Sequence, residues 1–140
     1  MMDYALVFKL VNLLILPGWV GLIFFPKSRY TQYLIYSHAY PYFLGLFYAY
    51  LVLSNFGLLQ NGMSSLDGIR AAFASDAVLL AGWVHYLIFD LFVGAWQVTD
   101  ARQHGLRHVK IVPALVFTLF LGPLGLLAYL IIRQLNLKAS

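Results

Sequence analysis

Cysteine is absent from the 140-residue chain, and charged residues are scarce. Without a thiol, the protein has no disulfide, no thiolate nucleophile and no zinc–thiolate site. Charged side chains make up 10% of the residues, whereas a soluble domain carries about 25%. The nine Lys and Arg are scattered, and no basic block or nucleic-acid motif is found. We therefore expect no nucleic-acid partner and no chemistry that depends on a thiolate.

Apolar residues dominate the chain instead, at 62% of the total, and aromatic residues reach 17%. A packed core of this length cannot hide so many apolar side chains from water, so lipid is the expected solvent. The first apolar run has no basic leader and no small-residue cleavage site, and no Ser- and Arg-rich transit peptide is found. We therefore expect a multi-pass protein of a bacterial inner membrane.

Four apolar stretches are each long enough to cross a hydrocarbon core of about 30 Å. They cover residues 4–25, 40–56, 76–98 and 111–132. Helices whose backbone groups are bonded internally are the simplest arrangement in lipid. The sequence thus predicts an all-α polytopic membrane protein, with a four-transmembrane-helix bundle that forms one domain over residues 1–140.

The connections between these stretches carry two further signals. The segment "SSLDGIRAAFAS" places Leu66, Ile69 and Phe73 on one face, which predicts a short interfacial helix. Five Lys and Arg fall in the first and third connections, against four elsewhere. By the positive-inside rule this small excess places those two connections in the cytoplasm and both termini outside.

The third stretch contains "WVHYLIFDLFVGAW", in which a carboxylate lies among apolar residues. Asp76, Trp83, Asp90 and Gln97 recur every seven residues and so share one helix face. An ionisable group inside a membrane helix indicates a functional cavity by default. The alternative is a structural tie, in which Asp90 bonds to a polar group at similar depth on another helix. Gly94, four residues after Asp90, leaves room for a neighbouring helix or a flat ligand.

His85 lies five residues before Asp90, about 140° away around the helix, so direct contact between the two is not expected. Together with Phe89, Phe92 and Trp96, His85 borders an aromatic side of the same helix. We expect His85 and Asp90 to face adjacent walls of one cavity. Alternatively, His85 simply donates to a backbone carbonyl.

A second set of polar residues, Asp100, His104 and His108, has the spacing of a metal-binding helix face. Gly105 interrupts that face, and the basic side chains around it would repel a cation. We therefore expect a solvated loop in the headgroup region here, with no metal.

The first and fourth stretches contain helix-weakening residues. Gly122, Pro123 and Gly125 remove side-chain bulk and a backbone donor in the fourth stretch. Pro17, Gly18 and Gly21 do the same in the first stretch. We predict two kinked helices beside a long apolar slot with aromatic walls. Ordinary flexing of transmembrane helices is the alternative.

The segments "WVHYLIFDLFVGAWQVTDA" and "HVKIVPALVFTLFLGPLGLLAYLIIR" resemble the abscisic acid-deficient-four-like family, which includes plant neoxanthin synthase. The resemblance is strongest over residues 76–133. It implies a four-helix membrane fold and carotenoid chemistry, namely conversion of the epoxide violaxanthin to the allenic neoxanthin. The residues that match the family motifs are Trp83, His85, Tyr86, Asp90, Gly94, Asp100, Gly122, Pro123 and Gly125.

The first functional hypothesis is therefore an isomerase or epoxide-opening enzyme that acts on a carotenoid without a redox cofactor. Asp90 is the expected acid or base, because desolvation favours its protonated form. His85 or Tyr86 is its expected counterpart, and the rings of Trp83 and Trp96 shield a cationic intermediate. The residues expected to line the ligand site are Asn12, Trp83, Phe89, Gly94, Trp96, Gly122 and Pro123.

Two other hypotheses remain open. The chain is equally suited to be a non-catalytic subunit that binds a carotenoid or another polyene or isoprenoid lipid beside a larger membrane complex. It would also suit a small transporter or channel with Asp90 as the proton or cation site, which would require a homo-oligomer to form a path. In each case membrane lipids are the expected surroundings.

Overall fold

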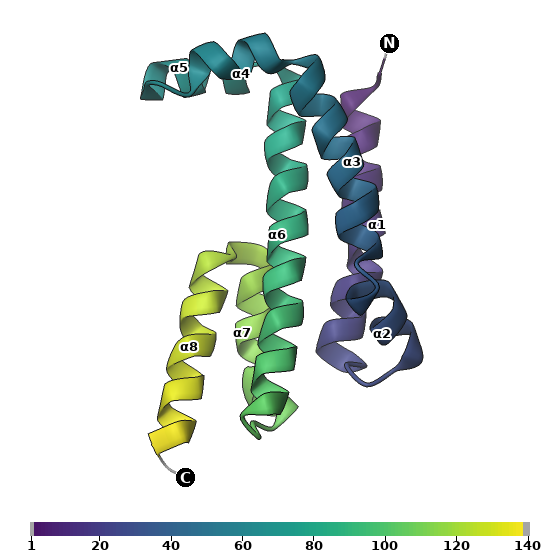
Figure 1. Ribbon diagram of the computed structural model, residues 1–140, viewed down its shortest axis with the longest axis vertical. Coiled ribbons are helices and arrows are strands. Elements are labelled where there is room, and N and C mark those ends of the chain that lie inside the picture. Colours follow the sequence, from purple (N-terminus) through teal and green to yellow (C-terminus); the bar gives the residue numbers. More distant parts are fainter. Residues whose placement is uncertain (1, 139–140) are drawn as a thin grey trace. The chain divides into compact units, whose positions relative to one another are not determined.

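The computed structural model describes residues 2–138, and every regular element in that stretch is an α-helix. The helices in chain order are α1 (Tyr4–Phe24), α2 (Arg29–Tyr36), α3 (Ala39–Ser54), α4 (Phe56–Gly62), α5 (Leu66–Phe73), α6 (Asp76–Gln103), α7 (His108–Leu121) and α8 (Pro123–Lys138) (Figure 1). The predicted all-α class is confirmed.

Two of these helices, α1 and α6, are long and apolar enough to cross a membrane. They contain 21 and 28 residues, and at about 1.5 Å per residue both reach the thickness of a hydrocarbon core. They correspond to the first and third predicted stretches. The second stretch forms α3, which has only 16 residues. Two of the four predicted spans therefore have the length and composition of a transmembrane helix.

The chain divides into two compact units. Unit 1 contains Met1–Leu14 and Tyr40–Ile88, and unit 2 contains Ile15–Ala39 and Phe89–Ser140. Helices α1 and α6 each begin in unit 1 and end in unit 2. Each unit is described separately below.

Many large apolar side chains lie on the surface. Leu46 of α3 is 74% exposed, and Phe120 of α7 is 69% exposed. Exposed apolar side chains occur along most of the helices. A soluble monomer, by contrast, exposes only scattered apolar residues. An apolar solvent around the helices would remove the free-energy cost of this exposure.

In unit 1, the connection between α3 and α6 forms two short helices that pack together. Gly62 of α4 lies against Gly68 of α5, where a Cβ atom added at Gly62 would come within 2.9 Å of the Gly68 carbonyl oxygen. Helix α5 begins at the Ser65 cap, whose side chain accepts a hydrogen bond from the Gly68 backbone amide. The predicted helix in this segment is confirmed, and its apolar residues Leu66 and Phe73 are exposed, as an interfacial helix requires.

In unit 2, the predicted fourth helix over residues 111–132 is wrong as a single element. Helix α7 ends at Leu121, and Gly122 has φ +33° and ψ −90°, outside the helical region. Pro123 then starts α8, which runs back along α7 as a helical hairpin (Figure 1). Lys110 Nζ near the start of α7 donates to Asn136 Oδ1 near the end of α8, at 2.6 Å. The expected kink is thus a full reversal.

Small residues allow the two arms of this hairpin to approach closely. A Cβ atom at Gly125 of α8 would collide with the backbone and side chain of Thr118 on α7. Both residues are buried. The core of unit 2 forms around this contact, and its fully buried side chains include Trp19, Leu22, Ile111, Leu115 and Tyr129.

Candidate functional site

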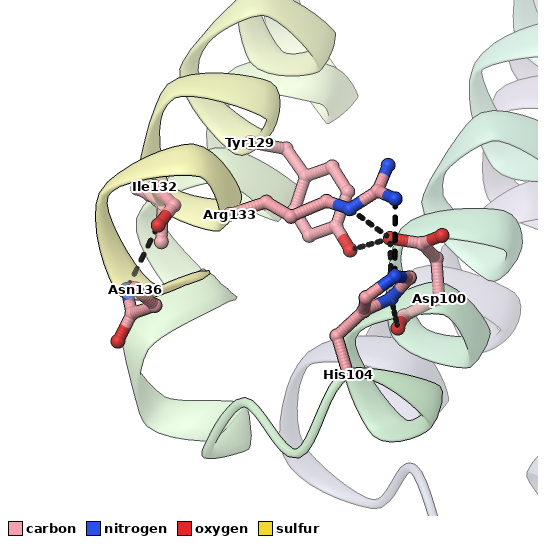
Figure 2. Close-up of polar contacts among 6 residues, drawn as sticks. All are labelled: Asp100, His104, Tyr129, Ile132, Arg133 and Asn136. Carbon is pink, nitrogen blue, oxygen red and sulfur yellow. Dashed lines mark hydrogen bonds and ion pairs between the residues drawn. The ribbon is translucent and has the colours of Figure 1, made fainter. Parts of the chain in front are cut away.

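A buried polar cluster in unit 2 links α6 to α8. The Asp100 carboxylate of α6, in a residue only 8% exposed, accepts a hydrogen bond from the Tyr129 hydroxyl of α8. Arg133, one turn further along α8, places its Nε atom 3.3 Å from the same Asp100 oxygen. Figure 2 shows Tyr129 and Arg133 pointing from α8 toward Asp100. Each partner offsets part of the desolvation cost of the buried carboxylate.

His104 completes this cluster on the α6 side. Its Nδ1 atom lies 2.8 Å from the Asp100 backbone carbonyl, and its Nε2 atom lies 3.1 Å from Arg133 Nη2 (Figure 2). A carbonyl oxygen only accepts and a guanidinium only donates, so both contacts are satisfied by the tautomer with the proton on Nδ1. His104 therefore fixes the Arg133 guanidinium in place by accepting from it.

The cluster replaces the solvated loop expected around Asp100, His104 and His108. That expectation is wrong for Asp100, because its carboxylate is turned toward α8. His108 is also engaged elsewhere, with Nε2 2.9 Å from the carbonyl oxygen of Ile23. Over the described part of the chain, no three His or Asp side chains are grouped as a metal site would require.

Further along the same face of α6, Gln97 is fully buried and bonded to α7. Its Nε2 atom donates to Thr118 Oγ1 at 2.9 Å. Thr118 Oγ1 also lies 2.9 Å from the Ala114 carbonyl oxygen. The sequence placed Gln97 on a polar stripe with Asp90, and in unit 2 both residues are buried, so this part of the stripe faces protein.

Asp90 lies at the turn of the hairpin. A Cβ atom added at Gly122 would come within 2.6 Å of Asp90 Oδ1 and 3.1 Å of Oδ2, so the carboxylate packs directly on the turn. Asp90 is 8% exposed, so the carboxylate is buried beside the turn.

Two other predicted ligand-site residues of unit 2 are engaged in packing. A Cβ atom at Gly94 would lie 2.9 Å from the ring of Trp19, so a side chain of α1 occupies the space beside this glycine. The Trp96 ring meets the Tyr129 ring edge to face, with centroids 5.5 Å apart. Phe89 differs, because 56% of it is exposed. Gly122 and Pro123 form the hairpin turn already described.

In unit 1, the predicted residues Asn12, Trp83 and Tyr86 come together. Trp83 Nε1 donates to Asn12 Oδ1 at 3.2 Å. The Trp83 ring lies between the rings of Phe8 and Tyr86, with centroid distances of 5.3 and 5.2 Å. Asn12 therefore acts at least as a helix-packing residue between α1 and α6.

His85 lines an apolar groove of unit 1 with a volume of about 530 Å³. Its ring lies 5.7 Å from the ring of Tyr48 on α3. Phe56, Met63 and Phe73 form other parts of the wall. This groove is largely apolar, and His85 supplies a polar ring to its wall. His85 belongs to unit 1 and Asp90 to unit 2, and each contributes to the site of its own unit.

Tyr129, Arg133 and Thr118 carry polar contacts of unit 2 that sequence reasoning missed. One signal was present, because Tyr129 and Arg133 are four residues apart and must share a helix face. Their partner Asp100 lies 29 residues before Tyr129. A pairing of that kind depends on the reversal at Gly122, which the sequence analysis interpreted as a kink.

These observations define a class: a helical protein suited to lipid, with buried carboxylates on a helix long enough to span a membrane. The family model described as ABA DEFICIENT 4-like matches residues 6–129. The chain belongs to this family, as the resemblance predicted.

A curated relative agrees with this assignment. The chain is similar to "Protein ABA DEFICIENT 4, chloroplastic" of Arabidopsis thaliana, with 24% identity over 139 residues. The alignment covers 92% of this chain and 61% of the relative, so the chain spans about three fifths of that protein's length. No solved structure matches the chain.

Proposed function

We propose that this chain is a multi-pass membrane protein that isomerises a carotenoid or a related isoprenoid by acid–base chemistry. Family membership supports a link to carotenoids, because the family resemblance implies carotenoid chemistry. The lengths and apolar character of α1 and α6, together with the exposed apolar side chains, support placement in a membrane. The relative's name assigns that protein to the chloroplast.

The proposed reaction is an isomerisation in which no electrons are gained or lost. An acid protonates an epoxide oxygen, and cleavage of the carbon–oxygen bond leaves a hydroxyl group and a cation delocalised along the polyene. A base then removes a neighbouring proton from carbon, which restores neutrality. Aromatic ring faces stabilise the cation in between.

The proposed roles follow the positions of the side chains. Asp90 is the acid, and its carboxylate has a fixed position because it packs on the hairpin turn at Gly122. His85 is exposed and lines the apolar groove of unit 1, where an isoprenoid chain can reach it. Tyr86 and Trp83 form an aromatic cluster on the same helix.

The observation that carries this proposal is a buried carboxylate on a helix of transmembrane length in a member of this family. The test is expression of the chain in a host that makes an epoxycarotenoid, followed by chromatography and mass spectrometry of the pigments. We expect a new product of unchanged mass that requires the chain.

Asp90→Asn keeps the shape of the side chain and removes the acid, so we expect product formation to fall at least about 100-fold. Asp76→Asn is the matched control, because Asp76 is exposed on the same helix, and it is expected to keep full activity. Undiminished product formation by Asp90→Asn, in equal amounts of folded protein, would eliminate Asp90 as the acid.

A second candidate function is non-catalytic binding of the same class of molecule, as a subunit of a homo-oligomer or a larger membrane complex. One observation favours it: the Asp90 carboxylate contacts the hairpin turn, as a structural residue would. Under this alternative the protein carries pigment, but the host's carotenoid composition does not change. The experiment above separates the two functions.

A further inference from the structure

A basic pocket lies at the end of unit 2 where the first and third connections meet. Its volume is about 280 Å³, and its charged lining consists of Lys27, Arg102 and Arg107, with His108 beside them. Val98 and Ala101 of α6 are buried and form an apolar floor. We call this the basic pocket. It brings together two connections that the sequence placed on the same side of the membrane.

The positive charge of the basic pocket is not balanced by nearby acids. Within residues 2–138, Lys27, Arg102 and Arg107 form no ion pair, and no Asp lines the pocket. Unit 2 has two acids. The Asp100 carboxylate is engaged with Tyr129 and Arg133, and the Asp90 carboxylate packs on the turn at Gly122. The pocket is therefore a concave site with three cations and no internal counter-charge.

The start of α7 adds to the uncompensated positive charge of the basic pocket. Arg107 is the N-cap residue of α7, makes no side-chain capping bond, and is followed by Lys110, while the first turn contains no acid. The positive end of a helix favours anions and disfavours cations. Basic side chains at this end raise the free energy of the empty pocket, and a bound anion would relieve the repulsion.

The pocket also lies where two helices of transmembrane length end. Helix α1 ends at Phe24, two residues before Pro26 in the pocket wall, and α6 ends at Gln103, next to Arg102. His108 joins the two ends through its contact with the Ile23 carbonyl oxygen. If α1 and α6 cross the bilayer, the pocket is at the level of the lipid headgroups.

We propose that the basic pocket binds the phosphate of an anionic phospholipid headgroup. Lys27, Arg102 and Arg107 contact the phosphate, and the apolar floor accommodates the glycerol end of the lipid. The volume exceeds that of a lone phosphate ion and suits a headgroup, and the apolar floor would not favour a free ion. This lipid site does not depend on the chemistry proposed for Asp90.

The experiment uses the full chain in nanodiscs of phosphatidylcholine and measures binding of added phosphatidylglycerol by native mass spectrometry and by thermal stabilisation. We expect one saturable phosphatidylglycerol per chain. The variant Lys27→Gln/Arg102→Gln/Arg107→Gln should bind at least about tenfold more weakly, because each cation near an anionic lipid contributes several-fold to affinity. Lys9→Gln/Arg70→Gln/Lys138→Gln removes the same charge elsewhere and should retain binding.

A third variant, Lys27→Arg/Arg102→Lys/Arg107→Lys, keeps all three charges and should bind nearly as well as the original chain, which separates charge from folding. Three outcomes would overturn the proposal: equal weakening in both glutamine variants, equal occupancy by phosphatidylcholine, or saturation of the pocket by inorganic phosphate alone. The last would assign the pocket to a soluble anion.

Discussion

Asp100 shows how a carboxylate is kept inside a largely apolar protein. The Tyr129 hydroxyl and the Arg133 guanidinium both reach it from α8, and His104 holds the guanidinium through Nε2. A buried charge that lost these partners would cost several kcal/mol. The cluster therefore ties α8 to the end of α6, and its loss should loosen the hairpin.

Tyr129→Phe tests this tie. The substitution keeps the ring and its contact with Trp96, but removes the hydroxyl that donates to Asp100. We expect the free energy of unfolding to fall by about 1–3 kcal/mol, because a buried charged acceptor loses a donor. Thermal unfolding in mild detergent, followed by circular dichroism, measures the loss. Tyr33→Phe is the control, since Tyr33 is 74% exposed, and an equal effect of both substitutions would contradict the role of Tyr129.

The sequence correctly predicted which helix face some of the polar residues of α6 occupy. The seven-residue spacing placed Asp90 and Gln97 on one face, and both are buried. Asp100 lies only three residues beyond Gln97, so it shares this face, but the surrounding basic and polar residues suggested solvent. The local pattern could not reveal Tyr129 and Arg133, because those partners depend on how the chain folds back after Gly122.

At the scale of the helices, the α7–α8 hairpin depends on one backbone conformation. Gly122 has φ +33°, which side chains disfavour, and the Asp90 carboxylate fills the space beside it. The sequence predicted a kink at Gly122 and Pro123, since both residues interrupt helices. The same residues also permit a reversal, and the choice depends on contacts such as Lys110 with Asn136 that are remote in sequence.

Gly122→Ala should therefore destabilise the protein by about 1–3 kcal/mol, through backbone strain and collision with Asp90. Gly45→Ala in α3 is the matched control, because a Cβ atom there meets nothing within 4 Å, and alanine favours helix by up to about 1 kcal/mol. Urea denaturation or thermal unfolding in detergent compares the two variants. Gly122→Ala with unchanged stability would contradict the turn geometry.

At the scale of the whole molecule, the hairpin changes the expected membrane topology. A single fourth span would place its two ends on opposite sides of the bilayer. In the hairpin, the start of α7 and the end of α8 lie together, so both ends should be on one side, as in a re-entrant segment. Hydropathy could locate the apolar stretch over residues 111–132, but hydropathy does not distinguish one long helix from two short antiparallel helices.

The absence of cysteine makes this topology directly testable. In single-cysteine variants labelled in sealed vesicles, Gln103→Cys and Gln134→Cys should react from the same side. Ser64→Cys, in the connection before α6, should react from the other side if α6 spans the membrane. Labelling of Gln103→Cys and Gln134→Cys from opposite sides would restore a single fourth span and contradict the hairpin.

We propose above that this family member binds or isomerises a carotenoid or isoprenoid within a membrane. The most direct measurement is purification of the chain in mild detergent from a pigmented host, with its visible absorption spectrum and the mass of the extracted pigment. We predict a protein-bound polyene, either from the host pool or an isomer of equal mass formed only when the chain is present. A colourless protein from a host whose pigments are unchanged would show that the chain neither binds nor converts a polyene.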